Sequence, residues 1–506
     1  MKIIALCGPV ASGKTTLAKT LSENCTGVSV VSTSSILADS AGRGLDRVGY
    51  LEVGNRLDRS DPRWILGRYS RHISTWDSDG RVLVIDAIRN PGQARNVRLW
   101  GGKVVMLGAP RTVLAERIQA RGRSLDQQAE DIDYGQFPAD YSFDTFEVDM
   151  GTIVERLFPF ITERKHSPSP VDAIIGGQYG SEGKGNIVSV IASKYSVLVR
   201  SGGPNAGHTV ILPDGSRYCY HHLPSGTRHN PEATVVIAPG AAIEPVRFLQ
   251  EVRECMGEVN PNRLKIDHRT MVIHPADRYT ETDGSDNLVT LVGSTGQGVG
   301  TAAVKRINRR NPEAHTVASI PELRDCLVDV PEYLSKVRGR ILLEGTQGSG
   351  LSLYHGPYPY TTSRDTNVTG LLSECGVEPC RLLDVYAVFR TFPIRVGGNS
   401  GPMRDEVDWD YIAKLCGTQA DTLRERERTS TTKRLRRVAM FDWDLFDRTV
   451  MLNKPTDLVL TFADYISTRD KFSQPLNDLI AGMEMRSGTR VRMVSFGNSP
   501  SDVVWR

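Results

Sequence analysis

A glycine-rich stretch near the middle of the chain constrains the fold more than any other feature. An apolar run, 171–175, leads into five glycines within residues 176–185, and an apolar, helix-periodic segment, 187–192, follows them. Strand, loop and helix in this order bring backbone N–H groups and a helix N-terminus toward an anionic ligand. Lys184 ends the loop, and its ammonium suits phosphate. No serine or threonine follows Lys184, so the loop is not a Walker A sequence, and a plain tight turn is the alternative.

Length and composition bound the kind of protein. At 506 residues, two or three domains are expected, because single hydrophobic cores rarely extend beyond roughly 300 residues. The net charge of +3 is too small to predict nucleic-acid binding, and no run of about 18 apolar residues predicts a membrane span. The eight cysteines are scattered and form no CxxC pair, which favours a reduced, cytoplasmic protein.

A second glycine-rich loop, residues 8–15, opens the chain. It reads Gly-Pro-Val-Ala-Ser-Gly-Lys-Thr, a full P-loop match, and it follows a β-rich run, 2–7. Backbone N–H groups would surround the phosphates, Lys14 would reach the β and γ oxygens, and Thr15 would hold Mg²⁺. The nucleotide-binding residues predicted in this loop and the following helix are Gly8, Gly13, Lys14, Thr15 and Thr16.

A second buried-strand pattern, 81–86, ends in Asp86. A carboxylate at the end of a strand beside a P-loop usually serves Mg²⁺ or its water, and a plain turn cap is the alternative. The segment Asp-Ala-Ile-Arg that follows resembles the DGxR segment of nucleoside monophosphate kinases. That resemblance implies that Arg89 meets the phosphate of the acceptor nucleotide.

A predicted helix, 114–123, carries Arg117 and Arg121, which resemble the lid arginines of the same kinases. A solvated cationic helix face is the alternative. Alternating strands and helices predict an α/β domain with a parallel sheet, whose site lies at the carboxyl ends of the strands. We therefore predict a kinase-like domain over 1–165, and a polar, proline-containing linker over 166–170.

Four further motifs follow the central loop. They read GGPNAGHT at 202–209, GSTGQGVG at 293–300, EGTQG at 344–348 and HGPYPYTTS at 355–363. Together with the central loop, they resemble the signature motifs of adenylosuccinate synthetases, whose loop reads GxQxGDEGKGK. The resemblance extends over 171–506 and implies an α/β ligase domain that uses Mg²⁺. In that family the purine 6-oxygen attacks the γ-phosphate of a nucleoside triphosphate, and the amine of L-aspartate then displaces phosphate.

Three residues lie at the family's catalytic positions. His208 matches the general acid and Lys184 the loop lysine, whereas Ser181 stands where the family has its general base, an Asp. Loss of a general base typically costs about 10²–10⁴ in rate, and this substitution also removes an oxygen ligand of Mg²⁺. Gly207 matches a carbonyl ligand of the metal, so the metal-binding positions expected are Ser181, Gly207 and, in the first domain, Thr15.

The serine leaves three explanations open: a domain without activity, another base such as a water held by Ser181, or a different purine. A bacteriophage branch that resembles this family carries Ser at this position. It joins aspartate to dGMP, which gives N6-succino-2-amino-2′-deoxyadenylate. The 2-amino group of guanine lies next to N1, where Ser181 would lie, although a carboxylate could also accept hydrogen bonds from guanine. We expect this reaction, and the alternatives are an ordinary synthetase that uses IMP and GTP, or a nucleotide-binding sensor.

Other matched residues imply binding rather than chemistry. Arg309 matches an arginine that crosses a dimer interface to the partner's nucleotide, so we expect a homodimer. The remaining substrate- and nucleotide-binding positions in these motifs are Gly180, Glu182, Gly183, Gly185, Asn205, Gly207, Thr295, Gly296, Gln347 and Thr362.

The segment 424–437 holds seven cations and two acids. It resembles the TTGRRRR loop that closes on aspartate, which implies that Thr432, Arg434 and Arg436 bind the amino acid, since a guanidinium suits carboxylates. Lys433 replaces the glycine of that loop. On composition alone, a solvated or nucleic-acid-facing loop is the alternative.

Phe462 and Asp464 match the TKLD motif that reads guanine in GTP-using members, with Phe in place of Lys. An aromatic ring stacks on any base, so we expect ATP or dATP rather than GTP. The alternative is that Phe462 is a plain core residue.

Overall fold

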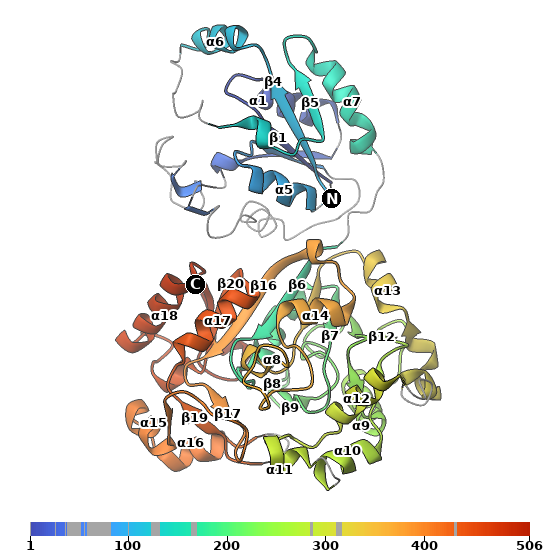
Figure 1. Cartoon of the computed structure of the whole chain (residues 1–506), viewed down its shortest axis with the longest axis vertical. Helices are drawn as coiled ribbons and strands as arrows, with labels where there is room; N and C mark the ends of the chain where they lie inside the picture. The colour runs from blue at the N-terminus through green and yellow to red at the C-terminus, as the bar shows by residue number, and fades with distance from the viewer. Residues whose placement is uncertain are drawn as a thin grey trace. The chain divides into compact units, whose positions relative to one another are not determined.

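The computed structural model describes residues 2–25, 27–35, 37, 52–54, 56–57, 82–99, 101–122, 132–162, 169–283, 287–309, 316–429 and 433–506. The chain divides into two compact units, Met1–Pro168 and Ser169–Arg506, which are described separately (Figure 1). Most of the predicted linker, residues 166–168, lies outside the described residues.

The N-terminal unit is built on a five-stranded sheet in the order β2-β3-β1-β4-β5, and all of its strand pairs are parallel. The strands are β1 (Lys2–Cys7), β2 (Val28–Ser32), β3 (Val82–Asp86), β4 (Lys103–Gly108) and β5 (Tyr141–Asp144). The main helices are α1 (Lys14–Asn24), α5 (Pro91–Leu99), α6 (Arg111–Gln119) and α7 (Met150–Thr162).

Apolar side chains cover both faces of this sheet. Strand β1 sends Ile4 and Leu6 to a cluster with Leu17 of α1 and Leu157 of α7, and its alternate residues pack with α5 on the other face. A strand that is buried on both faces appears in sequence as a continuous apolar run, which explains why β1 was predictable. The predicted parallel α/β fold of this unit is confirmed.

The C-terminal unit contains a ten-stranded sheet in the order β14-β12-β10-β7-β15-β6-β16-β20-β21-β22. Its pairs are parallel except the last, β21 with β22, so the sheet is mixed. The strands are β6 (Val171–Gly176), β7 (Val197–Arg200), β10 (Thr234–Ile237), β12 (Leu264–Asp267), β14 (Leu327–Val328), β15 (Ile341–Glu344), β16 (Leu382–Arg390), β20 (Asp457–Thr461), β21 (Val491–Ser495) and β22 (Val503–Trp505).

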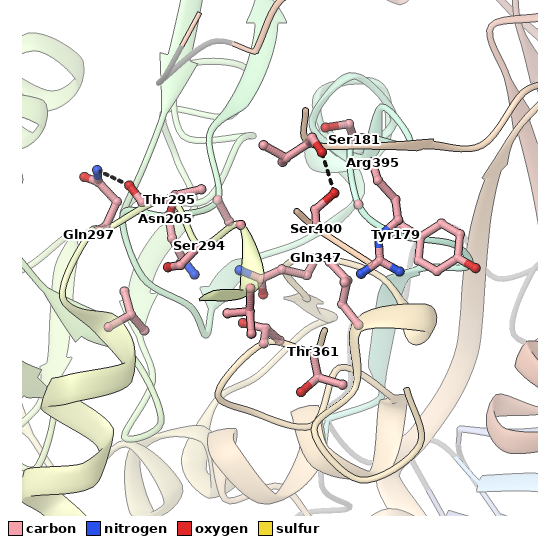
Figure 2. Close-up of a pocket in the computed structure, with 18 of the residues that line it drawn as sticks. Tyr179, Ser181, Asn205, Ser294, Thr295, Gln297, Gln347, Thr361, Arg395 and Ser400 are labelled. Carbon is pink, nitrogen blue, oxygen red and sulfur yellow. Dashed lines mark hydrogen bonds between the residues drawn. The ribbon is translucent and has the colours of Figure 1, made fainter. Parts of the chain in front are cut away.

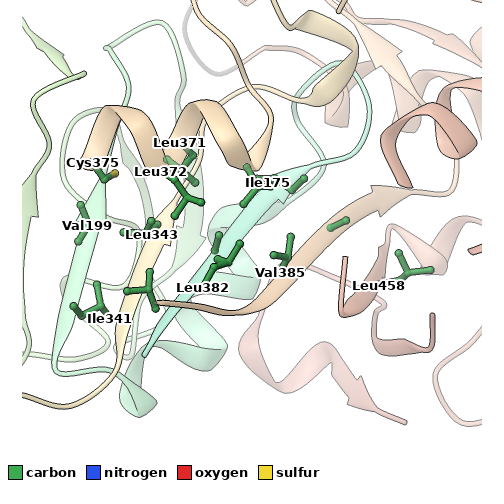
Figure 3. Packing of buried hydrophobic residues seen from close by; sticks show 14 of the residues in the cluster. Ile175, Val199, Ile341, Leu343, Leu371, Leu372, Cys375, Leu382, Val385 and Leu458 are labelled. Atoms are coloured by element: carbon green, nitrogen blue, oxygen red, sulfur yellow. The ribbon is translucent and has the colours of Figure 1, made fainter. Parts of the chain in front are cut away.

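Helices cover both faces of the central strands. Ile174 of β6 packs with α8 (Lys184–Ile191) on one face, while Ile175 joins a cluster on the other face. That second cluster includes residues of α14 (Val368–Cys375), α17 (Trp443–Asn453) and α18 (Gln474–Ser487), and Figure 3 shows Leu371 and Leu372 of α14 above Leu343 of β15. The core therefore fixes the carboxyl ends of β6, β15 and β16.

Smaller elements lie around this sheet. The hairpin of β8 (His208–Ile211) and β9 (Arg217–Tyr220) follows β7, and α10 (Pro275–Thr282), α11 (Leu288–Val292) and α12 (Val299–Asn308) form a helical group. A three-stranded sheet of β17 (Ile394–Arg395), β18 (Glu406–Val407) and β19 (Arg437–Ala439) packs with α15 (Trp409–Cys416) and α16 (Ala420–Arg426). All eight cysteines are free thiols. Among the described helices, none is both long and apolar enough to cross a bilayer.

Candidate active site

Loops from the carboxyl ends of β6, β7, β15 and β16 meet around a cavity of about 240 Å³ in the C-terminal unit (Figure 2). Ligands of parallel sheets bind at this edge because all the loops there converge. The predicted site residues that line the cavity are Gly180, Ser181, Lys184, Asn205, Gly207, His208, Thr295, Gln347, Thr362 and Arg436.

A buried carboxylate organises the glycine-rich loop from inside. Glu182 is fully buried and accepts hydrogen bonds from the N–H groups of Gln178 (3.1 Å) and Gly180 (2.7 Å). It also pairs with Lys184 Nζ at 2.7 Å, and Lys184 donates in addition to the carbonyl of Gln347. Glu182 does not line the cavity, and its contacts hold the glycine-rich loop from inside.

Ser181 is exposed at the cavity and has a left-handed backbone, with φ of 58°. A non-glycine residue in this region costs on the order of 1 kcal/mol and persists only where the surroundings hold it. Arg390 Nη1 donates to the Ser181 carbonyl at 3.5 Å and contributes to that hold. The loop therefore presents the hydroxyl at a defined place.

His208 begins β8 and is fixed by a buried carboxylate at the end of β15. Its Nδ1 lies 2.5 Å from Glu344 Oε1, which also accepts from Arg200 Nη1 at 3.1 Å. Ser225 donates its backbone N–H to Glu344 Oε2 at 2.7 Å. We assign the His208 proton to Nδ1, because a carboxylate at this distance accepts it, and Nε2 is then the nitrogen left for a ligand.

Burial and the positive charge of Arg200 lower the pKa of His208 to about 4, although Glu344 opposes them. Burial by itself raises the pKa of Glu344, but Arg200 and His208 outweigh it and bring that pKa to about 2. At neutral pH the pair is a carboxylate and a neutral imidazole. Negative charge near Nε2, as on a bound triphosphate, would favour protonation of His208.

The sequence interpretation missed Glu344 as a functional residue. Its signal was present, because the apolar run 341–343 ends in this acid just as the run before Asp86 does. An acid at the carboxyl end of a buried parallel strand lies at the edge where the site forms.

Arg395 is a second residue that the sequence did not single out. It is 3% exposed, lines the cavity and lies with its guanidinium 4.5 Å from the ring centre of Tyr179. Its Nη2 donates to the carbonyl of Tyr360 at 2.8 Å, and it forms no ion pair with any described carboxylate. Burial lowers the pKa of Arg395 to about 10. The cavity wall thus carries a positive charge that a substrate anion can neutralise.

The amino end of α12 already carries an anion. Glu281 is 2% exposed and accepts from the N–H groups of Gly298 (2.7 Å) and Thr301 (3.1 Å). Thr295 lines the cavity nearby, whereas Gly296 does not, because it packs beside Thr282. A phosphate would therefore meet hydroxyl and amide groups here rather than the unoccupied end of a helix.

Several predicted residues lie outside the cavity lining. Phe462 packs with its ring centre 3.9 Å from the Arg390 guanidinium, and Asp464 accepts from Arg426 Nη1 at 2.6 Å. Arg309 is exposed at the carboxyl end of α12. Thr432 lies outside the described residues, and the others that do not line the cavity are Gly183, which caps α8, Gly185, which packs beside His208, and Arg434, which is exposed.

The glycine-rich loop of the N-terminal unit, residues 8–15, is arranged differently from the central one. Lys14 Nζ donates to the carbonyls of Gly8 (2.8 Å) and Pro9 (2.6 Å). Thr15 Oγ1 donates to Asp86 Oδ2 at 2.8 Å, so a hydroxyl and a carboxylate lie together at the end of β3. These hard oxygens are the type that Mg²⁺ prefers.

Arg117 of α6 contacts this loop rather than projecting away from it. It donates to Thr145 Oγ1 at 2.9 Å and to the carbonyl of Ala11 at 3.4 Å. Gly13 has φ of 93° and caps α1. The remaining residues predicted for this unit are exposed at the surface, namely Thr16, Arg89 and Arg121.

Magnesium fits what is present in both units. The described residues contain no group of three His, Cys, Asp or Glu side chains that would hold a metal alone. Mg²⁺ commonly takes one or two protein oxygens and completes its shell with phosphates and water. Thr15 with Asp86, and Ser181 with the Gly207 carbonyl, are donors of that kind.

Comparison with known proteins agrees with this geometry. A family model described as adenylosuccinate synthetase matches residues 173–327 and 313–487, and one described as an AAA domain matches residues 4–137. The adenylosuccinate synthetase of Archaeoglobus fulgidus is 39% identical over 298 residues, which are 58% of this chain and 82% of the relative. That of Methanococcus maripaludis is 36% identical over 336 residues, which are 64% of this chain and 95% of the relative.

Two solved structures are similar to the C-terminal unit. The succinoaminodeoxyadenylate synthetase of cyanophage S-2L is 30% identical with a TM-score of 0.57, and the match covers 67% of this chain and 95% of that one. The adenylosuccinate synthetase of Plasmodium falciparum is 19% identical with a TM-score of 0.59, covers 67% and 100% respectively, and supports the fold alone. The ordered motifs, the cavity they form and these matches show that the chain belongs to the adenylosuccinate synthetase family, and its N-terminal parallel-sheet unit matches the AAA-domain model.

Proposed function

We propose that the C-terminal unit joins L-aspartate to dGMP, with ATP or dATP as phosphoryl donor, and forms N6-succino-2-amino-2′-deoxyadenylate. The observation that carries this proposal is the hydroxyl of Ser181, which lines the same cavity as His208 and Lys184. A hydroxyl is smaller than a carboxylate and uncharged, so it leaves space and a hydrogen-bond acceptor for an amino group at purine C2. The 30%-identical phage synthetase binds dGMP and dATP, which supports the same substrates here.

The described residues account for the two chemical steps. The purine 6-oxygen attacks the γ-phosphorus, the bond to the bridging oxygen breaks, and the nucleoside diphosphate leaves. His208, held by Glu344 through Nδ1–H, faces the 6-oxygen with Nε2; as negative charge accumulates on the purine and the γ-phosphate, Nε2 takes up a proton and donates a hydrogen bond to the 6-oxygen. The N1 proton passes to water held by Ser181, because a serine hydroxyl is a poor base. The aspartate amine then attacks C6, the C6–O bond breaks, and phosphate leaves with a proton from the amine nitrogen.

The cations of the cavity would hold the anionic substrates. Arg436 and Arg395 line the wall, and guanidinium groups suit the two carboxylates of aspartate. Mg²⁺ would neutralise phosphate charge, with the Ser181 hydroxyl and the Gly207 carbonyl as its protein oxygens. Asn205, Thr295 and Thr362 line the cavity and supply neutral donors.

A test of this proposal compares substrates with the full-length chain. Phosphate release is measured with aspartate, with dGMP or IMP, and with ATP, dATP or GTP. We expect turnover with dGMP and ATP or dATP. Turnover confined to IMP and GTP would identify an ordinary synthetase, and tight nucleotide binding without phosphate release would identify a sensor.

We also propose a homodimer, in which Arg309 reaches the monophosphate site of the partner. Its exposed position at the end of α12, outside the cavity lining of its own chain, supports this role. Analytical ultracentrifugation should give a dimer, and Arg309→Ala should raise the KM for dGMP about tenfold. A monomer with full activity would exclude the proposal.

A second activity is supported by the N-terminal unit. The Thr15–Asp86 pair beside Lys14 is an arrangement suited to Mg²⁺ and a triphosphate, so we propose a nucleoside monophosphate kinase. The acceptor would be a deoxynucleotide of the same reaction sequence. Formation of diphosphate from dGMP, dAMP or 2-amino-dAMP tests this, and no turnover of any of them would exclude it.

A further inference from the structure

A buried acid outside the recognised motifs connects three parts of the C-terminal unit. Glu427 follows α16, and its carboxylate is 1% exposed. Its Oε1 accepts from Arg390 Nη2 at 2.7 Å and from the Tyr465 hydroxyl, and its Oε2 accepts from Arg436 Nη1 at 3.2 Å. We propose that Glu427 is a positioning residue, which sets the Arg436 guanidinium in the cavity wall and the Ser181 carbonyl in the glycine-rich loop at the same time.

The contact toward Ser181 runs through Arg390, the last residue of β16. This arginine is completely buried, donates to the Ser181 carbonyl and lies 3.9 Å from the ring centre of Phe462. Its backbone is fixed as well, because its N–H donates to Gln178 Oε1 at 3.0 Å. The guanidinium can reach the loop only if a carboxylate stabilises its buried charge, and Glu427 is that carboxylate.

The contact toward the cavity runs through Arg436. Its backbone N–H donates to the Glu427 carbonyl at 3.0 Å, so main chain and side chain are held by the same residue. Its Nε is buried and has no hydrogen-bond partner in the described structure. Nη2 donates to no described residue, so it keeps its donors for a ligand in the cavity while Glu427 fixes Nη1.

Charge explains why one acid serves two arginines. Arg390, Arg436 and Glu427 carry a net charge of about +1, so the cluster still attracts an anion. Arg390 and Arg436 hold the pKa of Glu427 at about 2, against the effect of burial, so the acid stays ionised. If the charges of both arginines were neutralised, the cluster would have no net charge and would no longer attract the carboxylates of aspartate.

This inference rests on the proposed ligase function, since it assigns Arg436 to the amino-acid substrate. It predicts a specific kinetic change. A loss of stability alone reduces the amount of active enzyme, which lowers the apparent kcat and leaves KM unchanged. A displaced Arg436 instead raises the KM for aspartate in the molecules that remain folded.

The test is Glu427→Gln in the full-length chain. The amide has the same shape but no charge, and we expect the KM for aspartate to rise at least about tenfold, with a smaller rise for the purine monophosphate. The matched control is Glu406→Gln, which breaks the neighbouring Arg437–Glu406 pair outside the cavity lining and should change the KM for aspartate less than about twofold. A KM for aspartate that stays within about twofold in Glu427→Gln would overturn the inference.

Tyr465→Phe covers the case in which Glu427→Gln does not fold. It removes one hydroxyl donor from Glu427 and keeps both arginine pairs. We expect the KM for aspartate to rise about threefold, and an unchanged KM would contradict the inference. If the unmodified chain shows no aspartate-dependent phosphate release with any purine, the proposed function fails first and the inference falls with it.

Discussion

The two glycine-rich loops of this chain follow the same order of strand, loop and lysine-headed helix, yet their lysines are held in opposite ways. Lys14 donates to carbonyl oxygens of its own loop, those of Gly8 (2.8 Å) and Pro9 (2.6 Å). Lys184 is 2% exposed and forms a 2.7 Å ion pair with Glu182, which is fully buried.

This difference shows that a lysine after a glycine-rich loop can perform two kinds of task. Neutral carbonyls hold an ammonium weakly compared with a phosphate, so a phosphate can replace the carbonyls of Gly8 and Pro9 as acceptors for Lys14. If Lys184 moved to a ligand, the buried carboxylate of Glu182 would lose its cation. Lys184 therefore fixes the loop, and the loop presents other groups, chiefly Ser181, to the cavity.

The largest effect should come from Lys184→Met. This change leaves Glu182 buried without its cation, and breaking such a pair costs about 3–5 kcal/mol of unfolding free energy. Calorimetry of the full chain should show the loss in the transition of the C-terminal unit. Glu182→Gln should cost a similar amount, and the double variant should lose less than the sum of the two. Simple additivity would show that the pair is not a structural unit.

Lys14→Met should lower activity strongly and stability little, which is the opposite of the effect expected for Lys184→Met. Phosphoryl transfer by the N-terminal unit should fall by about 10²–10³, as for the loss of one preorganised charge contact, while its unfolding free energy changes by less than about 1 kcal/mol. A coupled assay of diphosphate formation and calorimetry on the same sample check both. A stability loss as large as that of Lys184→Met would remove the distinction between the loops.

The surroundings of the central glycine-rich loop, residues 176–185, should make the stability of the C-terminal unit sensitive to acid. The pKa of His208 is about 4 when folded and about 6.5 when unfolded, so the unfolded chain binds more protons between these values. The resulting stability is present above pH 6.5 and is lost as the pH falls toward 4, by roughly 3 kcal/mol. His208→Gln should flatten this slope in denaturation curves, and the other histidines whose pKa burial lowers contribute to the part that remains, namely His221, whose pKa is about 4, and His229. An unchanged slope would contradict the burial of a neutral imidazole.

The smallest effect expected is on substrate choice. Ser181→Asp restores the carboxylate that other members of the family carry, and we expect the ratio of kcat/KM for dGMP to that for IMP to fall at least about tenfold. Ser181→Ala is the matched control, because it removes the hydroxyl without adding charge. If the ratio stays constant in Ser181→Asp, the residue does not select the purine.

Much of the fold could be predicted from sequence because the buried strands are continuous apolar runs and their loops carry ordered motifs. The side-chain directions and hydrogen bonds inside the loops could not be predicted. The residue types alone do not show that Glu182 faces inward while Ser181 faces the cavity. The conformation of the turn decides the direction of each side chain. The contact of Phe462 with Arg390 could not be predicted either, because the two residues are more than 70 positions apart and no local pattern connects them.

The capping of α12 by Glu281 has a consequence for the ionic behaviour of the enzyme. Because an internal carboxylate occupies that helix end, the nearby Asn205 and Thr295 offer a monophosphate only neutral hydrogen bonds. Contacts of that kind are screened little by salt, whereas the guanidinium groups on the opposite wall attract aspartate through charge. Added electrolyte should therefore weaken the contacts of aspartate with Arg395 and Arg436 well before it weakens the contacts of the monophosphate with Asn205 and Thr295.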